Sequence, residues 1–161
     1  MTITFRRQQG FTLIEISVAL AVLAVMLLGA LPVYRNEQLR GKESELRQAL
    51  TQIRRALDEY KRAGDEGRIA KPADASGYPE SLDALVRGVQ RIGIPRVEVM
   101  YFLRQLPRDP FAEDASVTAA LTWQTRSYAS PPDSPSPGRD VFDVFSKSTK
   151  LGTNGVPYNK W

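Results

Sequence analysis

One carboxylate lies within an apolar segment near the N-terminus of the chain. Between Phe11 and Leu31 the only ionisable side chain is Glu15, and Gly10 stands directly before the segment. An ionisable side chain is costly to hold within an apolar span, and such residues usually have a functional partner. Glu15 is therefore the first candidate functional residue of the 161-residue chain.

The segment around Glu15 has the length of a transmembrane helix. A helix from Phe11 to Leu31 would be roughly 32 Å long, which is enough to cross a hydrocarbon core. Basic residues in the preceding stretch, MTITFRRQQG, favour a cytoplasmic N-terminus. Pro32 follows the segment and predicts a kink or a local opening of the helix. We expect residues 1–10 to form a leader and residues 11–34 to span a membrane.

A second, amphipathic half of the helix is predicted over residues 35–64. Apolar residues recur there at spacings of three, four and seven, which places them on one stripe. The stripe comprises Leu39, Leu46, Leu50, Ile53, Leu57 and Tyr60. Charged residues occupy the opposite face, where Glu43–Arg47 and Asp58–Arg62 are spaced for ion pairs. Gly64 predicts the end of the helix, and the stripe is expected to pack on the rest of the chain.

Residues 65–161 are expected to form the globular part. The patterns predict short helices over residues 81–86 and 98–105, and strands over residues 123–129 and 141–146. A turn is expected at Pro107-Arg108-Asp109-Pro110, where the aspartate can accept hydrogen bonds from nearby backbone amides. The predicted fold class is α+β, with one long N-terminal helix packed by its second half on a small antiparallel β-sheet.

Composition argues against several functional classes. The chain has no cysteine and no histidine, which removes disulfides, the commonest general base and the usual zinc ligand. Its formal net charge of +4 includes no long basic run. Arg87, Arg91 and Arg96 are the only loose candidates for phosphate contacts, so nucleic acid binding is not expected. We expect the chain not to be an enzyme, and a membrane-anchored enzyme is the less favoured alternative.

Two simpler interpretations of the N-terminal segment compete with a functional one. A secretory signal peptide would be cut after Leu28-Gly29-Ala30, but the apolar core is longer than usual and contains Glu15. A plain signal anchor explains the length of the apolar segment but gives no role to Glu15. The periodic helix also continues past the cut that a signal peptide would need.

The N-terminal motif resembles a known signal. Gly10-Phe11-Thr12-Leu13-Ile14-Glu15, followed by the apolar run and Pro32, resembles the class III signal of type IV pilins and type II secretion pseudopilins. The resemblance implies that a prepilin peptidase cuts between Gly10 and Phe11 and that the new amino group of Phe11 is methylated. It also implies the pilin fold and a filament of many copies.

The chemistry of Glu15 is consistent with that resemblance. Cleavage would create an α-amino group with a pKa of about 7.7–8 at the membrane edge. A carboxylate five residues along a straight helix reaches the amine of a neighbouring subunit more easily than its own. Pairing reduces the cost of holding both charges in an apolar bundle and sets the register between subunits.

The remainder of the chain resembles one branch of this family, the major pseudopilins of type II secretion. The segments that carry this resemblance are Gly77–Leu85, Tyr101–Phe111, Trp123 with Arg126-Ser127-Tyr128, and Asp143-Val144-Phe145-Ser146. The implied protein is a single-pass bacterial inner-membrane protein with a periplasmic C-terminal domain. Its implied partners are further copies, other pseudopilins, the prepilin peptidase and the inner-membrane assembly platform.

The C-terminal loop departs from that branch. Major pseudopilins bind calcium in this loop, and the matching residues here are Asp143, Leu151 and Asn154, with an asparagine where the family has an aspartate. Calcium requires six to eight oxygen ligands, and Lys147 and Lys150 add positive charge nearby. We expect the calcium site to be degenerate and the protein to need no cofactor.

The sequence thus predicts a structural subunit of a periplasmic pseudopilus. The alternative within the family is a minor or major pilin of a type IV pilus, including a competence pilin that takes up DNA.

Overall fold

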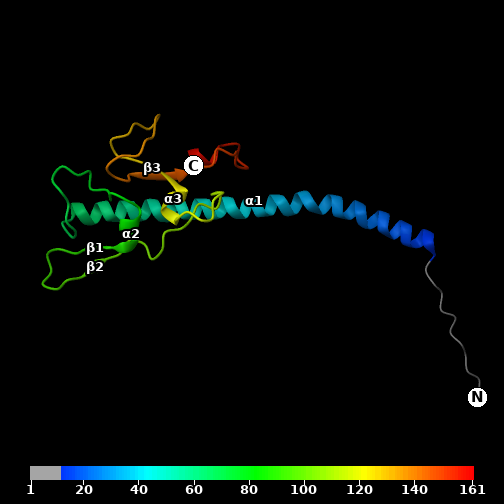
Figure 1. Ribbon diagram of the computed structural model, residues 1–161, viewed down its shortest axis with the longest axis horizontal. Helices are drawn as coiled ribbons and strands as arrows, with labels where there is room; N and C mark the ends of the chain where they lie inside the picture. Colours follow the sequence, from blue (N-terminus) through cyan, green and yellow to red (C-terminus); the bar gives the residue numbers. More distant parts are fainter. Residues whose placement is uncertain (1–11) are drawn as a thin grey trace, which may run out of the picture. The chain divides into compact units, whose positions relative to one another are not determined.

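The computed structural model describes residues 12–161, except for the side chains of residues 27–33, 35 and 36 (Figure 1). The predicted leader, residues 1–10, and Phe11 lie outside the described residues. The chain divides into two compact units, Met1–Arg40 and Gly41–Trp161, and each is described by itself.

Helix α1 extends over Leu13–Asp65 and contributes to both units. Thr12 caps its start, because the backbone amide of Glu15 donates to Thr12 Oγ1 at 3.3 Å. The helix ends in a Schellman motif, in which the amide of Arg68 donates to the carbonyl of Ala63 at 2.8 Å. Gly67, with φ of 70°, takes the left-handed position of this motif. Sequence reasoning had assigned the stop to Gly64, three residues too early.

The first unit contains the predicted membrane span. Among the residues that the structure describes, no helix combines the length and the apolar character needed to cross a membrane. Part of the predicted span 11–34, namely Phe11 and the side chains of residues 27–33, lies outside the described residues. The backbone at Pro32 is helical without interruption, although a local opening was predicted there.

The second unit places short elements around the second half of α1. These elements are α2 (Asp83–Arg87), β1 (Val89–Gln90), β2 (Val99–Met100), α3 (Ala119–Thr122), β3 (Trp123–Arg126), β4 (Asp143–Ser146) and the 3₁₀ helix η1 (Tyr158–Lys160). Strands β1 and β2 form one antiparallel pair. Strands β3 and β4 form the other, with Trp123 opposite Ser146 and Arg126 opposite Asp143. The fold is therefore a helix with two small antiparallel sheets, where a single sheet was predicted.

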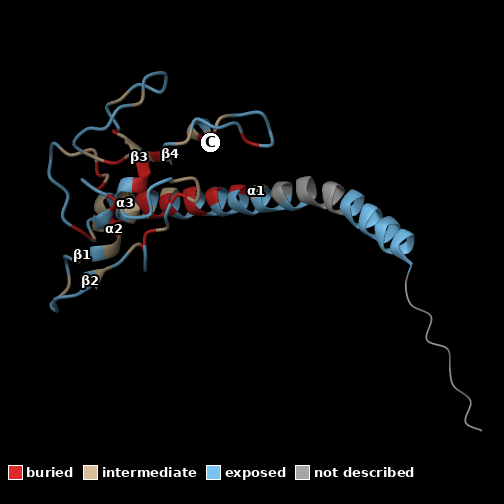
Figure 2. Ribbon diagram, turned by 45° about the vertical axis from the view of Figure 1, so that its right-hand side comes forward, coloured by how far each residue is buried: buried red, intermediate tan, exposed pale blue. Residues whose placement is uncertain are grey.

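The core of the second unit surrounds the second half of α1 (Figure 2). The β3–β4 pair packs against this helix, and so do Leu85 of α2 and the segment 103–106. The middle of the predicted stripe, Leu46, Leu50, Ile53 and Leu57, is buried, which confirms the helical period. Trp123, Val144 and Tyr158 pack on it from the C-terminal part of the chain. Burial of large apolar side chains contributes about 1.5–3 kcal/mol each, so this contact stabilises the unit.

The helix predicted over residues 98–105 is wrong. Val99 and Met100 form β2, and the amides of Phe102 and Leu103 both donate to the carbonyl of Leu85. Valine at alternate positions 97 and 99 favours a strand, and pairing with β1 satisfies its backbone. The predicted strands and the helix near residue 83 are confirmed with shifted ends.

Candidate processing and assembly site

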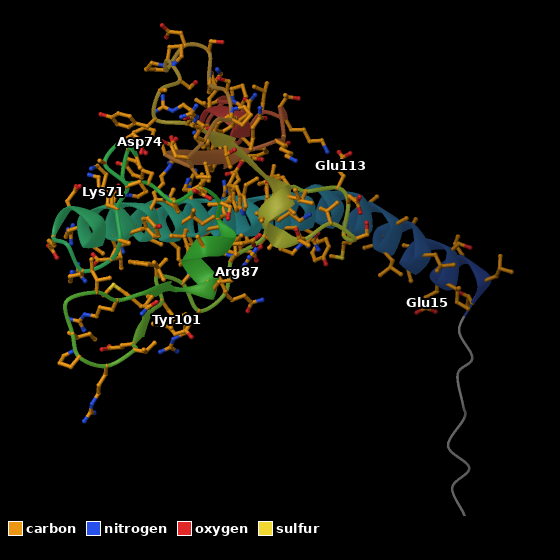
Figure 3. All side chains as sticks on the ribbon, turned by 60° about the vertical axis from the view of Figure 1, so that its left-hand side comes forward. Glu15, Lys71, Asp74, Arg87, Tyr101 and Glu113 are labelled. Atoms are coloured by element: carbon orange, nitrogen blue, oxygen red, sulfur yellow. The ribbon has the colours of Figure 1, made fainter. Side chains whose placement is uncertain are left out.

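Glu15 lies in the first turn of α1 and is exposed (Figure 3). Thr12 and Glu15 stand three residues apart, which is the spacing of a capping box. A carboxylate in the first turn also faces the positive end of the helix dipole. Thr12 thus caps the amide of Glu15, and the Glu15 carboxylate stands where the helix dipole favours a negative charge. The threonine–x–x–glutamate pattern could have indicated this helix start, and sequence reasoning missed it.

The turns after Glu15 present apolar side chains to the outside of the first unit. The exposed large residues include Leu13, Ile16, Leu20, Leu23 and Met26, and Leu13 is 86% exposed. Ile14, Val18 and Val22 are exposed on the opposite side of the helix, so apolar side chains surround it. Such a surface needs a cover of lipid or of other apolar helices.

The structure does not describe the side chains of the other predicted processing and assembly residues. Gly10, Phe11 and the side chain of Pro32 lie outside the described part of the chain. Of the predicted processing and assembly residues, Glu15 is therefore the one whose side chain lies in the described part of the chain.

Glu43 occupies a position that sequence reasoning assigned wrongly. It is 2% exposed and points to the C-terminal loop rather than to solvent. Its carboxylate accepts from the amide and the hydroxyl of Thr153, both at 2.6 Å, and from the hydroxyl of Tyr158 at 3.0 Å. The predicted partner, Arg47, lies with its guanidinium 4.5 Å from the ring centroid of Trp161.

The hydrogen bonds among Glu43, Thr153 and Tyr158 determine which of these side chains is charged. Burial by itself would raise the pKa of the Glu43 carboxyl, but the hydrogen bonds from Thr153 and Tyr158, helped by the nearby Arg47, leave that pKa below its ordinary value. Burial and the bond to Glu43 raise the pKa of the Tyr158 hydroxyl to about 12. A buried carboxylate thus accepts hydrogen bonds from a neutral phenol and a threonine at neutral pH.

A second charged contact fixes the chain terminus. The Arg54 guanidinium donates to Asp143 Oδ1 at 2.8 Å, to the carbonyl of Val144 at 3.1 Å and to that of Trp161 at 2.9 Å. Glu43 and Arg54 therefore attach the C-terminal segment to α1 at two places.

The three candidate calcium residues are engaged within the fold. Asp143 pairs with Arg54, Asn154 Oδ1 accepts from the amide of Val156 at 3.0 Å, and Leu151 bridges Pro157. Within the described part of the chain, no group of three or more acidic side chains is placed to hold a metal ion. The calcium prediction itself stays untested.

The predicted role of Asp109 as an acceptor for nearby backbone amides is confirmed, but the turn runs over residues 109–112, where the amide of Ala112 donates to the carbonyl of Asp109 at 3.1 Å, and not over the predicted residues 107–110. Asp109 is buried, its Oδ1 accepts from the amide of Phe111 at 2.8 Å, and its Oδ2 accepts from the hydroxyl of Ser146 at 2.6 Å. The aspartate therefore ties this turn to β4.

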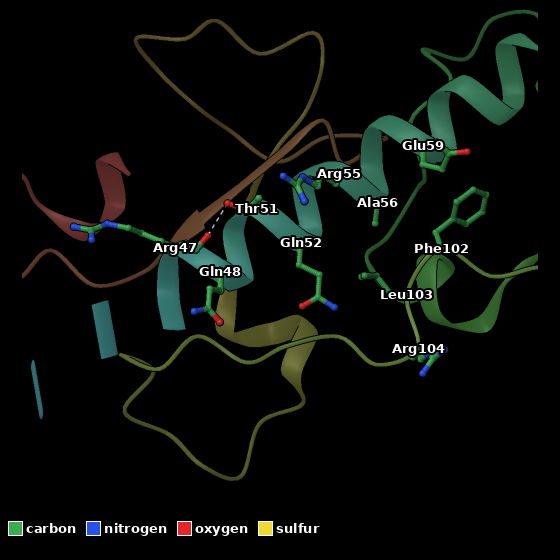
Figure 4. Close-up of a pocket in the computed structure, with 10 residues that line it drawn as sticks. All are labelled: Arg47, Gln48, Thr51, Gln52, Arg55, Ala56, Glu59, Phe102, Leu103 and Arg104. Atoms are coloured by element: carbon green, nitrogen blue, oxygen red, sulfur yellow. Dashed lines mark hydrogen bonds between the residues drawn. The ribbon is translucent and has the colours of Figure 1, made fainter. Parts of the chain in front are cut away.

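A groove of about 810 Å³ follows the exposed face of α1 beside residues 102–104 (Figure 4). Gln48 and Gln52 extend toward it, whereas Arg47 extends away toward the C-terminal turn. Its one lining carboxylate, Glu59, pairs with Arg62 at 3.0 Å and with Arg68 at 3.1 Å. The observed partner of Arg62 is thus Glu59, where Asp58 was predicted.

The three arginines considered for nucleic acid lie on α2 and the β1–β2 hairpin. Arg87 pairs with Asp83 and Arg91 pairs with Glu98, each at 3.5 Å. Two of the three charges are therefore compensated within the chain.

Comparison with known families bears on the N-terminal segment. Residues 5–31 match the model of the prokaryotic N-terminal methylation motif. The chain carries this motif. The matched range includes Gly10, Phe11 and Glu15 and ends one residue before Pro32. Searches among curated proteins and solved structures found no match.

The motif is found in type IV pilins and pseudopilins. It supports N-terminal methylation and prepilin-type processing of this chain. It indicates a precursor of the pilin-like or pseudopilin type and does not separate the two.

Proposed function

We propose that the chain is a structural pseudopilin that polymerises into a periplasmic pseudopilus of a type II secretion-like machine. The single observation that carries this proposal is the match of residues 5–31 to the N-terminal methylation motif. In this proposal a prepilin peptidase cuts between Gly10 and Phe11, and the new amine is methylated. Before assembly the subunit resides in the inner membrane, with residues 41–161 in the periplasm.

The exposed apolar side chains of the first unit support a change of surroundings during assembly. Residues such as Leu13, Leu20 and Met26 would contact lipid before assembly and the helices of other subunits afterwards. Lipid and the helices of other subunits can both cover these apolar side chains. The subunit can therefore move from the membrane into the filament without refolding of α1. The work of transfer would come from an assembly platform and its ATPase.

Glu15 would act when the subunit joins the filament. Its carboxylate would pair with the positively charged N-terminal amine of the neighbouring subunit. In an apolar bundle, removal of one partner leaves the other charge buried and uncompensated, which costs about 3–5 kcal/mol. This cost would favour one axial register over all others.

A substitution at Glu15 tests this role. Glu15→Gln keeps the size of the side chain and removes its charge, and Glu37→Gln is the matched control on the exposed surface of the same helix. We expect both variants to be processed, and only Glu15→Gln to be lost from sheared filament fractions when it is expressed beside the wild type. Equal incorporation of the two variants would contradict the proposed role.

The alternative within the same family is a minor or major pilin of a type IV pilus, including a DNA-uptake pilin. A DNA-uptake role predicts a gel shift that weakens steeply with salt, because phosphate contacts release counterions. The internal pairing of Arg87 and Arg91 favours the pseudopilus.

A further inference from the structure

The tip of the β1–β2 hairpin, residues 92–97, is an apolar projection with one charged side chain, that of Arg96. Val97 is 84% exposed and Ile92 is 44% exposed. Arg96 is exposed and makes no ion pair with any described residue. The ion pair Arg91–Glu98 joins the two sides of the hairpin at its base, and the backbone bridge between Ile69 and Arg91 attaches this base to the loop after α1. The tip therefore projects from an anchored base.

A cavity of about 850 Å³ lies between residues 72–80 and residues 127–140. We call it the acidic cavity. Tyr78 and Tyr128 stack beside it with ring centroids 6.0 Å apart, and Tyr128 is 60% exposed. Pro131 and Pro137 extend its apolar lining. Such a surface suits an apolar side chain that carries a cation next to it.

The charge of the acidic cavity is opposite to that of the hairpin tip. Its lining carries the carboxylates of Asp74, Glu80 and Asp140 against the single guanidinium of Arg139. Asp140 accepts hydrogen bonds from the hydroxyl of Ser76, from Ser127 Oγ at 2.7 Å and from the amide of Tyr128 at 2.8 Å. Burial raises the pKa of the Asp140 carboxyl, but these bonds, that from Ser76 first, leave it below its ordinary value. Asp74 and Glu80 are exposed, and no described residue forms an ion pair with either.

We propose that the hairpin tip of one copy docks in the acidic cavity of a second copy of this chain. The tip and the acidic cavity lie on opposite sides of α1 within the second unit (Figures 1 and 3). The tip of one copy therefore cannot enter the cavity of the same copy. A contact between two different surfaces leaves one of each free at the ends and can therefore continue from copy to copy. In this contact Val97 covers the Tyr128 ring, and Arg96 faces Asp74 and Glu80. The inference rests on the proposed function and specifies which surfaces of the globular part meet in the filament.

Cysteine crosslinking in the full chain tests the contact. The chain has no native cysteine, so each introduced pair reports only on itself. A chain carrying both Val97→Cys and Tyr128→Cys should give a ladder of disulfide-linked multimers after mild oxidation with copper phenanthroline in its host membrane. A mixture of the two single variants should give dimers only. The control pair Val97→Cys with Glu113→Cys, whose second site is exposed outside the cavity, should give neither.

A charge exchange provides a second readout. Arg96→Glu should lower the yield of the Val97–Tyr128 crosslink about tenfold, which corresponds to about 1.4 kcal/mol. Combining Asp74→Arg with Arg96→Glu should restore the yield. Filaments that sediment without this crosslink, crosslinking to another pilin-like subunit only, or equal crosslinking of the control pair would each overturn the docking and leave the proposed function standing. Absence of both filaments and crosslinks would overturn the docking, while the mass of the processed chain would still report on the precursor assignment.

Discussion

Glu43 on α1 and Thr153 in the C-terminal loop, 110 residues apart in sequence, form a doubly hydrogen-bonded pair. The carboxylate accepts from the backbone amide and from the hydroxyl of Thr153, both at 2.6 Å. Hydrogen bonds to a charged group contribute about 1.5–3 kcal/mol, and an unsatisfied buried partner costs as much again. Together with the contacts of Arg54, this pair therefore holds the C-terminal segment against α1.

Loss of the Glu43 charge should destabilise the second unit. Glu43→Gln keeps one oxygen to accept from the Thr153 amide, but it removes the negative charge that strengthens the hydrogen bonds from Thr153 and Tyr158. We therefore expect a loss of about 2 kcal/mol in the free energy of unfolding. Chemical unfolding of the detergent-solubilised chain, followed by circular dichroism, measures it. Glu45→Gln, on the exposed face of the same helix, should change stability by less than about 0.5 kcal/mol. Equal effects of the two variants would show that the pair is not formed.

Stability should fall at both ends of the pH scale. The folded-state pKa of Glu43 is below its unfolded value, so its contribution is present above the unfolded pKa, about 4.3, and is lost as the pH falls through the folded pKa. The pKa of Tyr158 is raised to about 12, so its contribution is complete below about pH 10 and is lost as the pH rises toward 12. Melting temperatures across this range should show a smaller acid loss in Glu43→Gln and a smaller alkaline loss in Tyr158→Phe. Unchanged pH profiles in both variants would contradict this assignment.

Calcium should have no effect on unfolding. The loop oxygens that a calcium ion would need already have partners, because Asp143 pairs with Arg54 and Asn154 accepts from Val156. We expect the same melting temperature in calcium and in chelator. A ligand that binds only the folded state raises stability by about 2.7 kcal/mol at 100 times its Kd, so a clear increase with calcium would show an occupied site.

Gly152 should not tolerate a side chain. A Cβ built there would lie 2.6 Å from Trp161 Cζ2 and 3.0 Å from Asn154 Oδ1. Gly152→Ala should therefore destabilise the unit by about 1–3 kcal/mol, the usual cost of overpacking. Gly41→Ala is the control, since nothing lies within 4 Å of a Cβ there and alanine favours a helix by up to about 1 kcal/mol. A stabilising Gly152→Ala would mean that Trp161 does not pack on this glycine.

The sequence predicted the elements that have a regular period. Leu46, Leu50, Ile53 and Leu57 form the buried stripe, and the strands at Trp123 and Asp143 pair as one hairpin-like sheet. These predictions depend on local patterning, which a single sequence contains. The helix predicted over residues 98–105 failed because its backbone pairs with a strand that lies ten residues earlier.

Glu43 shows what local patterning misses at the candidate site. It lies three residues before Leu46 and seven before Leu50, so its spacing places it on the buried stripe. Its charge favoured assignment to the exposed face, and only the distant Thr153 and Tyr158 explain why a carboxylate is tolerated there. The motif around Glu15 was readable from the sequence because its residues are contiguous.

The most direct test of the proposed function is the intact mass of the membrane form of the protein. The account predicts loss of residues 1–10, a new N-terminus at Phe11 and the addition of one methyl group, all abolished by a substitution at Gly10. A full-length mass would contradict prepilin-type processing. So would a chain cut after Ala30, which would make the N-terminal segment an ordinary secretory signal.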